Sequence, residues 1–409
     1  MSTCLGSVTQ RSGAHFPSTP CHQMTVRHRV GIVARLRKAL TAGVLAIGLT
    51  ACGGEGTTAT PIIIDQGKIT VFAGIPGNPG ATDGGGESAQ FAALQGITTD
   101  NVGNFYVADS GGAGTLRKIT PTGVVSTLLS GLTLPATLNL RATTIIGLGY
   151  LPRTSEIVYT NMWMYVVTPK IPSAGVMKQT FIPPYSPLFD IVVPGTRPTE
   201  MAVDVSGNVY VALGEYIRKL DPAGVVTTVA GMVGNPQANI FPIAGSADGI
   251  GTTAGFDGAF GIAVDASDNV FVADSNNKTV RKISPTGLVT TLAGLVGQAG
   301  TADGTGSAAR FTHPRRLTVD KAGNVYVVDT SNTNNNPFAP DTGNSTIRKI
   351  SSSGVVTTIA GQSGGGIGTT TSGPLPGKLA NLRAITVGAD GALYVNTVDA
   401  VLKIALPVN

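Results

Sequence analysis

The sequence predicts an all-β fold, a six-bladed β-propeller that is closed by its own first strand. Three observations support this prediction. A unit of four short strands recurs along the chain, its first and last copies are incomplete in complementary ways, and glycine-rich turns separate the strands. The 409 residues include 55 Gly but only 12% charged residues. Glycine adopts positive φ without penalty, so this composition suits tight turns between strands better than surface helices.

One copy of the repeat shows the four strands, which we name a, b, c and d. They are Gly261–Asp265, Asn269–Asp274, Thr279–Ile283 and Val289–Gly294. Each run is rich in Val, Ile, Phe or Thr and is bounded by turn residues, a pattern typical of strands. The turns between a and b and between c and d are short, so neighbouring strands must be antiparallel.

The same pieces recur before and after this copy. Strand c of successive copies ends at Leu220, Ile283 and Ile350. The interval from Ile119 to Leu220 is about twice a repeat, so we expect a degenerate blade between them. Its candidate strands are Thr143–Leu148, Glu156–Thr160, Met164–Thr168 and Val176–Ile182.

The two ends of the repeat region predict how the ring closes. The last copy has strands a, b and c (Arg383–Val387, Ala392–Asn396 and Val401–Ala405) but no strand d. An orphan run, Lys68–Gly74, matches strand d at the other end. Pairing it with the last copy removes two unpaired sheet edges. A linear β-solenoid is the alternative, but it gives no reason for complementary ends.

Several strings carry a family resemblance. Gly-Ile-Ala-Val-Asp at 261–265, Asn-Val-Phe-Val-Ala-Asp-Ser at 269–275 and Val-Arg-Lys-Ile-Ser-Pro-Thr-Gly at 280–287 resemble NHL repeats. The resemblance covers roughly residues 67–405, and the degenerate blade departs from it. It implies the propeller fold but leaves function open. The family includes extracytoplasmic sensors, scaffolds and RNA binders, and its relatives include lactonases and lyases.

The beginning of the chain has the pattern of an export signal. A basic stretch, Arg27 to Lys38, precedes the apolar run Ala39–Ala51, which is too short to span a bilayer as a helix. The ending Leu-Thr-Ala-Cys at 49–52 resembles a bacterial lipobox, which implies that Cys52 is lipidated. We therefore expect a leader at 1–51, a lipidated Cys52 with a flexible tether at 52–66, and the propeller at 67–409. Met1 and Met24 are both candidate translation starts.

Charge and cysteine content narrow the function classes. Residues 1–51 carry six of the 28 basic groups and no acid, leaving 22 basic against 23 acidic groups. A near-neutral propeller argues against a nucleic-acid partner. Cys4 and Cys21 lie in the leader, so neither a disulfide framework nor a cysteine metal site is expected. We expect a monomer in the cell envelope that touches the membrane only through its lipid. Gly53 is not an acidic inner-membrane retention signal, which favours the outer membrane.

Loop lengths predict the binding face. The a–b and c–d turns are all short, whereas every long connection lies on the opposite face, where strands a begin. Long loops on one face of a rigid scaffold usually form the binding surface. We call this region the channel mouth. An envelope protein or a small anionic ligand is the predicted partner there, bound by Arg315, Arg316, Arg383, Gln95, Glu200 and His313. Two alternatives stay open: the arginines pair with loop carboxylates such as Asp257, or the segment around Trp163 forms a second protein-binding surface.

An enzyme is the second functional hypothesis, because some six-bladed relatives are metal-dependent lactonases or lyases. The resemblance places the lactonase ligands just before strand a, where this chain has Gln95, Thr199, Phe260, Arg315 and Arg383. None is a carboxylate or an asparagine, and divalent cations such as calcium need several oxygen ligands. His313 is the one histidine outside the leader, and a lone loop histidine is usually solvated. We therefore assign no catalytic residue, cofactor or metal.

Two sets of repeated aspartates look functional but are predicted to be structural. Asp83, Asp248 and Asp303 each precede a glycine, and Phe91, Phe256 and Phe311 follow them. Each loop offers one carboxylate, too few for calcium, so we expect the Asp to cap a glycine turn and the Phe to plug between blades. At the end of strand b, Asp109, Asp274 and Asp329 can each reach an arginine of strand c as a cross-strand pair.

Overall fold

The computed structural model describes residues 67–111, 114–130, 145–161, 168–172, 198–232, 242–331, 344–362 and 372–407. The leader, Cys52, the tether and Trp163 lie outside these residues. Gly67–Leu406 forms one compact unit. In the described part of the chain, no helix is long and apolar enough to cross a membrane.

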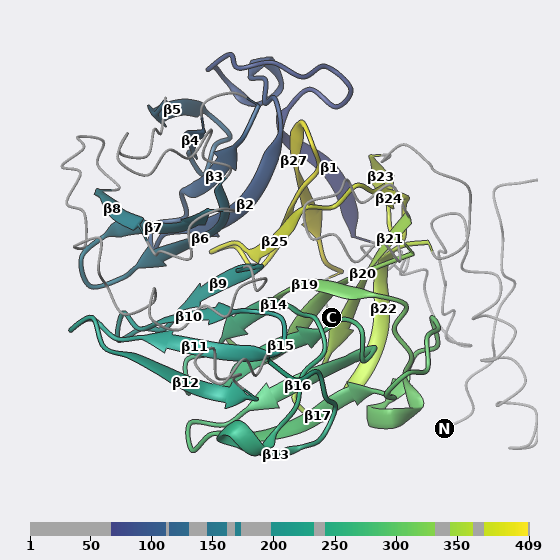
Figure 1. Cartoon of the computed structure of the whole chain (residues 1–409). Coiled ribbons are helices and arrows are strands. Elements are labelled where there is room, and N and C mark those ends of the chain that lie inside the picture. Colours follow the sequence, from purple (N-terminus) through teal and green to yellow (C-terminus); the bar gives the residue numbers. More distant parts are fainter. Residues whose placement is uncertain are drawn as a thin grey trace, which may run out of the picture. The chain divides into compact units, whose positions relative to one another are not determined.

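The described residues form six antiparallel sheets around a common centre (Figure 1). In order from the innermost strand outward, the first three sheets are β2 (Leu94–Thr99), β3 (Phe105–Asp109), β4 (Thr115–Ile119) and β5 (Val125–Leu129); β6 (Ile145–Leu151), β7 (Glu156–Asn161) and β8 (Thr168–Pro172); and β9 (Glu200–Val203), β10 (Val209–Ala212), β11 (Tyr216–Leu220) and β12 (Val226–Gly231).

The other three sheets each gain a two-residue strand at the outer edge. In the same order they are β14 (Ala259–Val264), β15 (Val270–Asp274), β16 (Thr279–Ile283), β17 (Leu288–Gly294) and β13 (Gly249–Ile250); β19 (Pro314–Val319), β20 (Val325–Thr330), β21 (Asn344–Ile350), β22 (Val355–Gly361) and β18 (Gly304–Thr305), with β24 (Leu379–Ala380) beside β21; and β25 (Ala384–Val387), β26 (Leu393–Asn396), β27 (Ala400–Ala405), β1 (Lys68–Gly74) and β23 (Gly373–Pro374). Three short 3₁₀ helices, Gly86–Ser88, Gly251–Thr253 and Gly306–Ala308, complete the described elements.

The propeller prediction is confirmed, and the predicted count of six blades is corrected to five complete blades within the described residues. Five sheets have the full complement of four strands, whereas β6–β8 has three within the described residues. The shortfall falls in the stretch whose sequence departs from the repeat. There, β8 begins at Thr168, where the expected strand c was to end, and the expected strand Val176–Ile182 lies outside the described residues.

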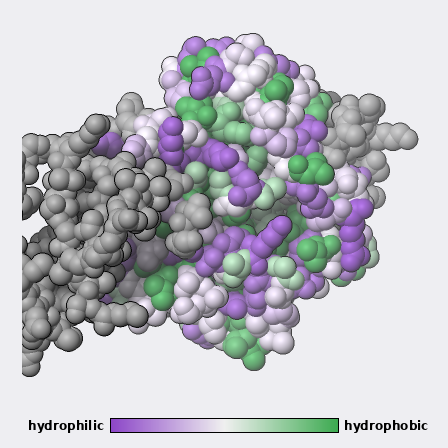
Figure 2. Space-filling model, turned by 180° about the vertical axis from the view of Figure 1, so that it is seen from behind, coloured by the Kyte–Doolittle hydropathy of each residue, from purple (hydrophilic) through white to green (hydrophobic). Residues whose placement is uncertain are grey.

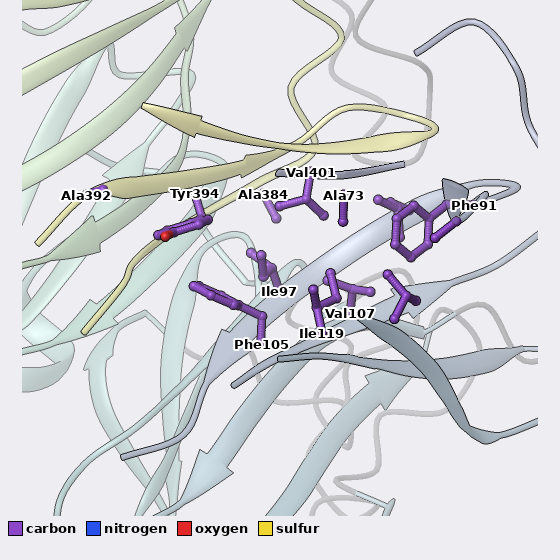
Figure 3. Packing of buried hydrophobic residues seen from close by; sticks show 13 residues of the cluster. Ala73, Phe91, Ile97, Phe105, Val107, Ile119, Ala384, Ala392, Tyr394 and Val401 are labelled. Atoms are coloured by element: carbon purple, nitrogen blue, oxygen red, sulfur yellow. The ribbon is translucent and has the colours of Figure 1, made fainter. Parts of the chain in front are cut away.

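The predicted closure of the ring is confirmed. Strand β1 pairs antiparallel with β27, from Lys68 opposite Ala405 to Gly74 opposite Ala400. The same junction has a shared apolar core, in which side chains from β1, from the last blade and from the β2–β5 blade meet (Figure 3). The rings of Phe105 and Tyr394 lie 4.2 Å apart between centroids. The first and last blades are therefore joined by backbone pairing and by packing.

The short turns between strands a and b are held by a repeated Asp–Asn pair. The Asp carboxylate accepts a hydrogen bond from the Asn side-chain amide four residues later, and it also accepts backbone N–H groups of the turn. The Asn nitrogen-to-Asp oxygen distances are 2.7, 2.6, 2.8 and 2.8 Å for Asp100–Asn104, Asp204–Asn208, Asp265–Asn269 and Asp320–Asn324. This face of the propeller is therefore rigid.

The repeated aspartates form buried clusters with arginine, as predicted for the strand-b set. Arg281 Nη1 lies 2.8 Å from Asp274, and the matching pairs Arg117–Asp109 and Arg348–Asp329 are at 3.3 and 3.5 Å. The loop aspartates have a different partner from the one expected: Asp83, Asp248 and Asp303 bind the same arginines at 2.7, 2.7 and 2.8 Å. The following phenylalanines are fully buried in the cores between blades, as predicted.

Candidate functional site

A cavity of about 250 Å³ lies at the centre of the ring. Every innermost strand contributes to its wall; one residue from each is Ile97, Leu148, Met201, Ile262, Leu317 and Ile385. These strands contact one another in a closed circuit, from β2 through β6, β9, β14, β19 and β25 back to β2 (Figure 1). Each is the terminal strand of its sheet. The backbone N–H and C=O groups on its free edge therefore have no ladder partner and can hydrogen-bond to a guest.

The cavity extends to the face with the short turns. Asn101 and Pro152 line it, and each lies beyond the last residue of an inner strand. Glu200, the first residue of β9, lines its opposite end. Because the inner strands run from the long-loop face to the short-turn face, the cavity extends away from the long-loop face, and Glu200 is the one predicted channel-mouth residue that lines it.

Glu200 lines the end of the cavity nearer the long-loop face, and Arg316 pairs with it there. Arg316 Nη1 donates a hydrogen bond to the Thr199 carbonyl oxygen at 2.7 Å and lies 3.7 Å from Glu200 Oε2. The N–H of Ile262 points at the same carboxylate oxygen at 3.4 Å. The pair therefore links β9 to β19 past the intervening β14. Gly261 permits this approach, because a Cβ there would come within 2.9 Å of the Arg316 Cα.

The environment of Glu200 sets its protonation state. Burial raises its pKa to about 7, and the nearby Arg316 guanidinium opposes part of that rise. Both forms of the carboxyl group are therefore populated near neutral pH. The protonated form donates a hydrogen bond and the ionised form accepts several, so Glu200 can pair with either a hydrogen-bond acceptor or a hydrogen-bond donor of a ligand.

Arg315 and His313 lie together around the ring of Phe260. The Arg315 guanidinium is 4.7 Å from the Phe260 centroid, and the His313 ring meets the same ring edge-on at 6.3 Å. His313 is 1% exposed, which corrects the expectation of a solvated histidine. Burial, Lys278 and Arg315 lower the pKa of His313 to about 3. The imidazole is therefore neutral, and its Nδ1 lies 3.1 Å from Lys278 Nζ.

Gln95 and Arg383 lie where the first and last blades meet. Asn396 Nδ2 donates to the Gln95 carbonyl oxygen at 3.3 Å, and the Arg383 N–H donates to the Asn396 carbonyl at 2.8 Å. The alternative that the arginines pair with loop carboxylates such as Asp257 can be compared with the ion pair of Arg316. Arg316 pairs with Glu200, and Asp257 accepts from the Asn276 amide.

The six predicted residues thus fall into three groups. Glu200 and Arg316 are in direct contact, Arg315 and His313 share Phe260, and Gln95 and Arg383 are joined through Asn396. Sequence reasoning named Thr199 only as a position lacking a ligand group, and it missed Lys278 and Asn396. Thr199 accepts from Arg316 through its backbone carbonyl, which no side-chain motif signals, and Asn396 uses both its side-chain amide and its backbone carbonyl. Within the described ranges, no group of three or more His, Cys, Asp or Glu could hold a metal ion.

Comparisons with known proteins support the fold. No family model matches the chain. Residues of this chain are 33% identical over 121 positions to Protein SUPPRESSOR OF QUENCHING 1, chloroplastic, from Arabidopsis thaliana. The match covers 29% of this chain and 11% of that protein, so the chain spans about a ninth of the relative's length.

Solved structures match over much more of the chain. A protein of unknown function from Bacteroides thetaiotaomicron has a TM-score of 0.61 at 20% identity, covering 89% of this chain and 82% of its own. An auxiliary nutrient binding protein from Bacteroides ovatus has a TM-score of 0.58 at 15% identity, covering 85% and 78%. A protein of the same description from Bacteroides thetaiotaomicron has a TM-score of 0.57 at 16% identity, covering 88% and 82%. These likenesses establish a shared β-propeller fold.

Proposed function

We propose that this protein is an exported binding module whose central cavity takes a small, uncharged, hydroxyl-rich molecule. The observation that carries the proposal is the cavity itself. The free edges of the innermost strands surround about 250 Å³ of space, and the Glu200 carboxyl group lies at the end nearer the long-loop face. A cavity near 300 Å³ is at the small end of the range that small-molecule sites occupy.

The wall matches a ligand that both donates and accepts hydrogen bonds. Free strand edges supply N–H donors and C=O acceptors, and Thr98, Thr318 and Thr386 add hydroxyl-bearing residues that play either part. The groups belong to a closed ring of strands, so little ordering is required when a ligand binds.

Charge favours an uncharged ligand. When Glu200 is ionised, Arg316 balances its charge, so this end of the cavity then has no large net charge. Binding of an anion at the channel mouth remains a proposal with less support. Arg315 and Arg316 are 6% and 9% exposed, and Arg316 is already bonded to Thr199 and close to Glu200.

A surface view also favours a small ligand over a large protein partner. On the face drawn in Figure 2, hydrophilic and hydrophobic described residues are interspersed. The exposed large hydrophobic side chains, such as Val102, Val205 and Ile250, lie in two different turns and in the short strand β13. Contiguous apolar patches are the usual mark of a surface that a protein partner covers, so an envelope protein is the less favoured partner.

The cellular setting is part of the same proposal. We infer an NHL-type propeller anchored in the cell envelope through a lipidated Cys52 and acting as a monomer, with β6–β8 as its sixth blade. The contacts of β6 with both β2 and β9 support the blade assignment. The basic and apolar stretches before Cys52 support export. Two structural relatives are described as auxiliary nutrient binding proteins, a role that agrees with an envelope binding module.

An enzyme acting on the same ligand is the second candidate. The pKa of Glu200, raised to about 7 by burial, is what a general acid–base group at neutral pH requires. The lactonase or lyase alternative would in that case use the Glu200 carboxyl as its proton-transfer group.

A ligand screen with matched variants tests the proposal. We expect members of a panel of polyols and monosaccharides to raise the melting temperature of the wild-type protein. Glu200→Gln and Thr318→Val should each weaken that response, whereas Lys282→Gln, on a strand away from the cavity, should keep it. A wild type that no panel member stabilises, or a Thr318→Val variant that responds fully, would count against the cavity. Conversion of a bound panel member by wild type but not by Glu200→Gln would select the enzyme.

A further inference from the structure

Three blades show in detail how this fold binds a carboxylate. The loop residue Asp248 accepts from Arg281 Nη2 at 2.7 Å, from the Thr291 N–H at 3.1 Å and from the Thr291 hydroxyl at 3.0 Å. The same three donors bind Asp83 in the β2–β5 blade and Asp303 in the β19–β22 blade, at distances between 2.7 and 3.2 Å. The cradle therefore consists of an arginine on strand c and a threonine on strand d.

The β9–β12 blade has the same donors at the same register. Arg218 lies opposite Val211 and Thr228, as Arg281 lies opposite Val272 and Thr291. The two ladders even share the register shift just before the arginine. The backbone and the two donor side chains of this cradle are therefore built in the same way in the β9–β12 blade.

Among the described residues, this blade lacks both acceptors. Leu213 occupies the end of strand b, where the other three blades have Asp109, Asp274 or Asp329. Asp83, Asp248 and Asp303 each stand twelve positions before the residue that precedes strand a in their blade. In the β9–β12 blade the residue that precedes strand a is Thr199, and Pro187 stands twelve positions before it. Among the described residues, none forms a hydrogen bond or ion pair with the Arg218 guanidinium, which lies 5.4 Å from the Tyr216 ring centroid.

A guanidinium with no anion beside it among the described residues is unusual at this depth. Arg218 is 5% exposed, and burial lowers its pKa, although arginine stays charged in proteins. An uncompensated buried charge is strongly destabilising. The last blade lacks the whole cluster, with Leu402 at the arginine position and Thr397 at the strand-b position. A blade of this fold can therefore lack both the arginine and its aspartate, yet the β9–β12 blade retains the arginine.

We propose that Arg218 and Thr228 form a binding site for an oxyanion, a carboxylate or phosphate group supplied by another molecule. The position is reachable from solvent, because the loop aspartates that fill it in the other blades have side chains 47 to 49% exposed. Arg218 supplies a planar pair of donors, and Thr228 supplies a hydroxyl and a backbone N–H, so a tetrahedral or a planar anion can be held at three points. This site is independent of the central cavity.

Inorganic phosphate is the probe that tests the site. At constant ionic strength, replacing chloride by phosphate should raise the melting temperature of the wild-type full-length protein. Thr228→Val should weaken phosphate binding about tenfold or more, since a hydrogen bond to a charged group is lost. Thr227→Val, at the neighbouring exposed position, is the matched control and should bind phosphate as wild type does.

A second variant keeps the test valid if removal of Arg218 prevents folding. Leu213→Asp restores the strand-b carboxylate, which in the β14–β17 blade pairs with Arg281 Nη1 while the loop aspartate occupies Nη2. It should therefore raise the melting temperature in chloride and reduce the phosphate effect, because it neutralises the Arg218 charge. The same phosphate response in wild type, Thr228→Val and Leu213→Asp would overturn the proposal. The last comparison tests whether the chain's own Asp190, the one acidic residue between residues 173 and 197, occupies the site. If Asp190→Asn destabilises wild type but not Arg218→Leu, and phosphate has no effect, the occupant is the chain's own carboxylate and the proposal is wrong.

Discussion

Arg316 reaches past β14 to donate a 2.7 Å hydrogen bond to the Thr199 carbonyl, which places its guanidinium 3.7 Å from the Glu200 carboxylate. This contact engages two of the charged groups that the sequence assigned to the channel mouth. One of them, Glu200, lines the end of a cavity that extends to the opposite face, where the short turns lie. Four predictions rest on this contact, on the ion-pair clusters within the blades and on the two ends of the propeller.

The first prediction concerns pH and Glu200. Its folded-state pKa, about 7, lies above the ordinary value of 4.5, so the folded protein binds more protons than the unfolded chain between these pH values. Stability contributed by this group should therefore be lost as pH rises from about 4.5 to 7. Glu200→Gln removes the titration, and the difference in unfolding free energy between the two proteins should change by about 3 kcal/mol across this window. Urea unfolding at several pH values measures it, and parallel pH profiles for the two proteins would contradict the assignment.

The second prediction ranks the two aspartates that bind Arg281. The side chain of Asp274 is fully buried and that of Asp248 is 49% exposed. Asp274→Ala should cost about 3–5 kcal/mol of unfolding free energy, because it removes one partner of a buried pair. Asp248→Ala should cost about 1 kcal/mol, because solvent screens that pair. Urea unfolding compares them directly. Equal losses would mean that burial does not control the strength of these pairs.

The third prediction concerns ring closure. Deleting residues 52–75 removes β1, exposes the edge of β27 and takes Ala73 from the shared core at the junction. It should lower the melting temperature much more than deleting residues 53–60, which lie before the first described strand. Calorimetry of the two truncations gives the comparison. Similar melting temperatures would show that the β1–β27 pairing contributes little.

The fourth prediction concerns membrane attachment. If Cys52 carries the lipid, Cys52→Ser should move the protein from the membrane fraction to the soluble fraction of the producing bacterium. Fractionation followed by immunoblotting tests this, with Cys21→Ser as the matched control that should stay attached. A Cys52→Ser protein that remains with membranes would exclude this anchor.

The sequence predicted the fold well because the repeat is periodic and its ends are complementary. The strand-b to strand-c pairs, the closing strand Lys68–Gly74 and the phenylalanine plugs all follow from patterns that alternate or repeat. The two-residue strands β13, β18 and β23 were missed, since two residues have no periodicity. In the incomplete sheet β6–β8, the third strand was predicted at Met164–Thr168 but begins at Thr168, because the sequence of this sheet departs from the repeat.

The site was harder to predict because its geometry depends on contacts between distant blades. Loop length pointed to the long-loop face, but it gives no information about which side chains cross the axis. Arg316 and Thr199 are 117 positions apart, and the acceptor is a backbone carbonyl. The burial of His313 depends on Phe260 and Lys278, which also lie far from it in the chain. Arg315 and Arg316 were therefore assigned to ligand binding and His313 to solvent, whereas packing encloses all three.

The ratio of ligand affinities for Glu200→Gln and Arg383→Gln tests the central claim most directly. Glu200 lines the cavity, whereas Arg383 belongs to the channel mouth at the other end of the inner strands. For the panel member that binds wild type best, isothermal titration calorimetry should show affinity about tenfold or more weaker in Glu200→Gln, since hydrogen bonds to a charged group are lost. Arg383→Gln should bind with the affinity of wild type. The reverse order, with Arg383→Gln impaired and Glu200→Gln unchanged, would place the ligand at the mouth and contradict this account.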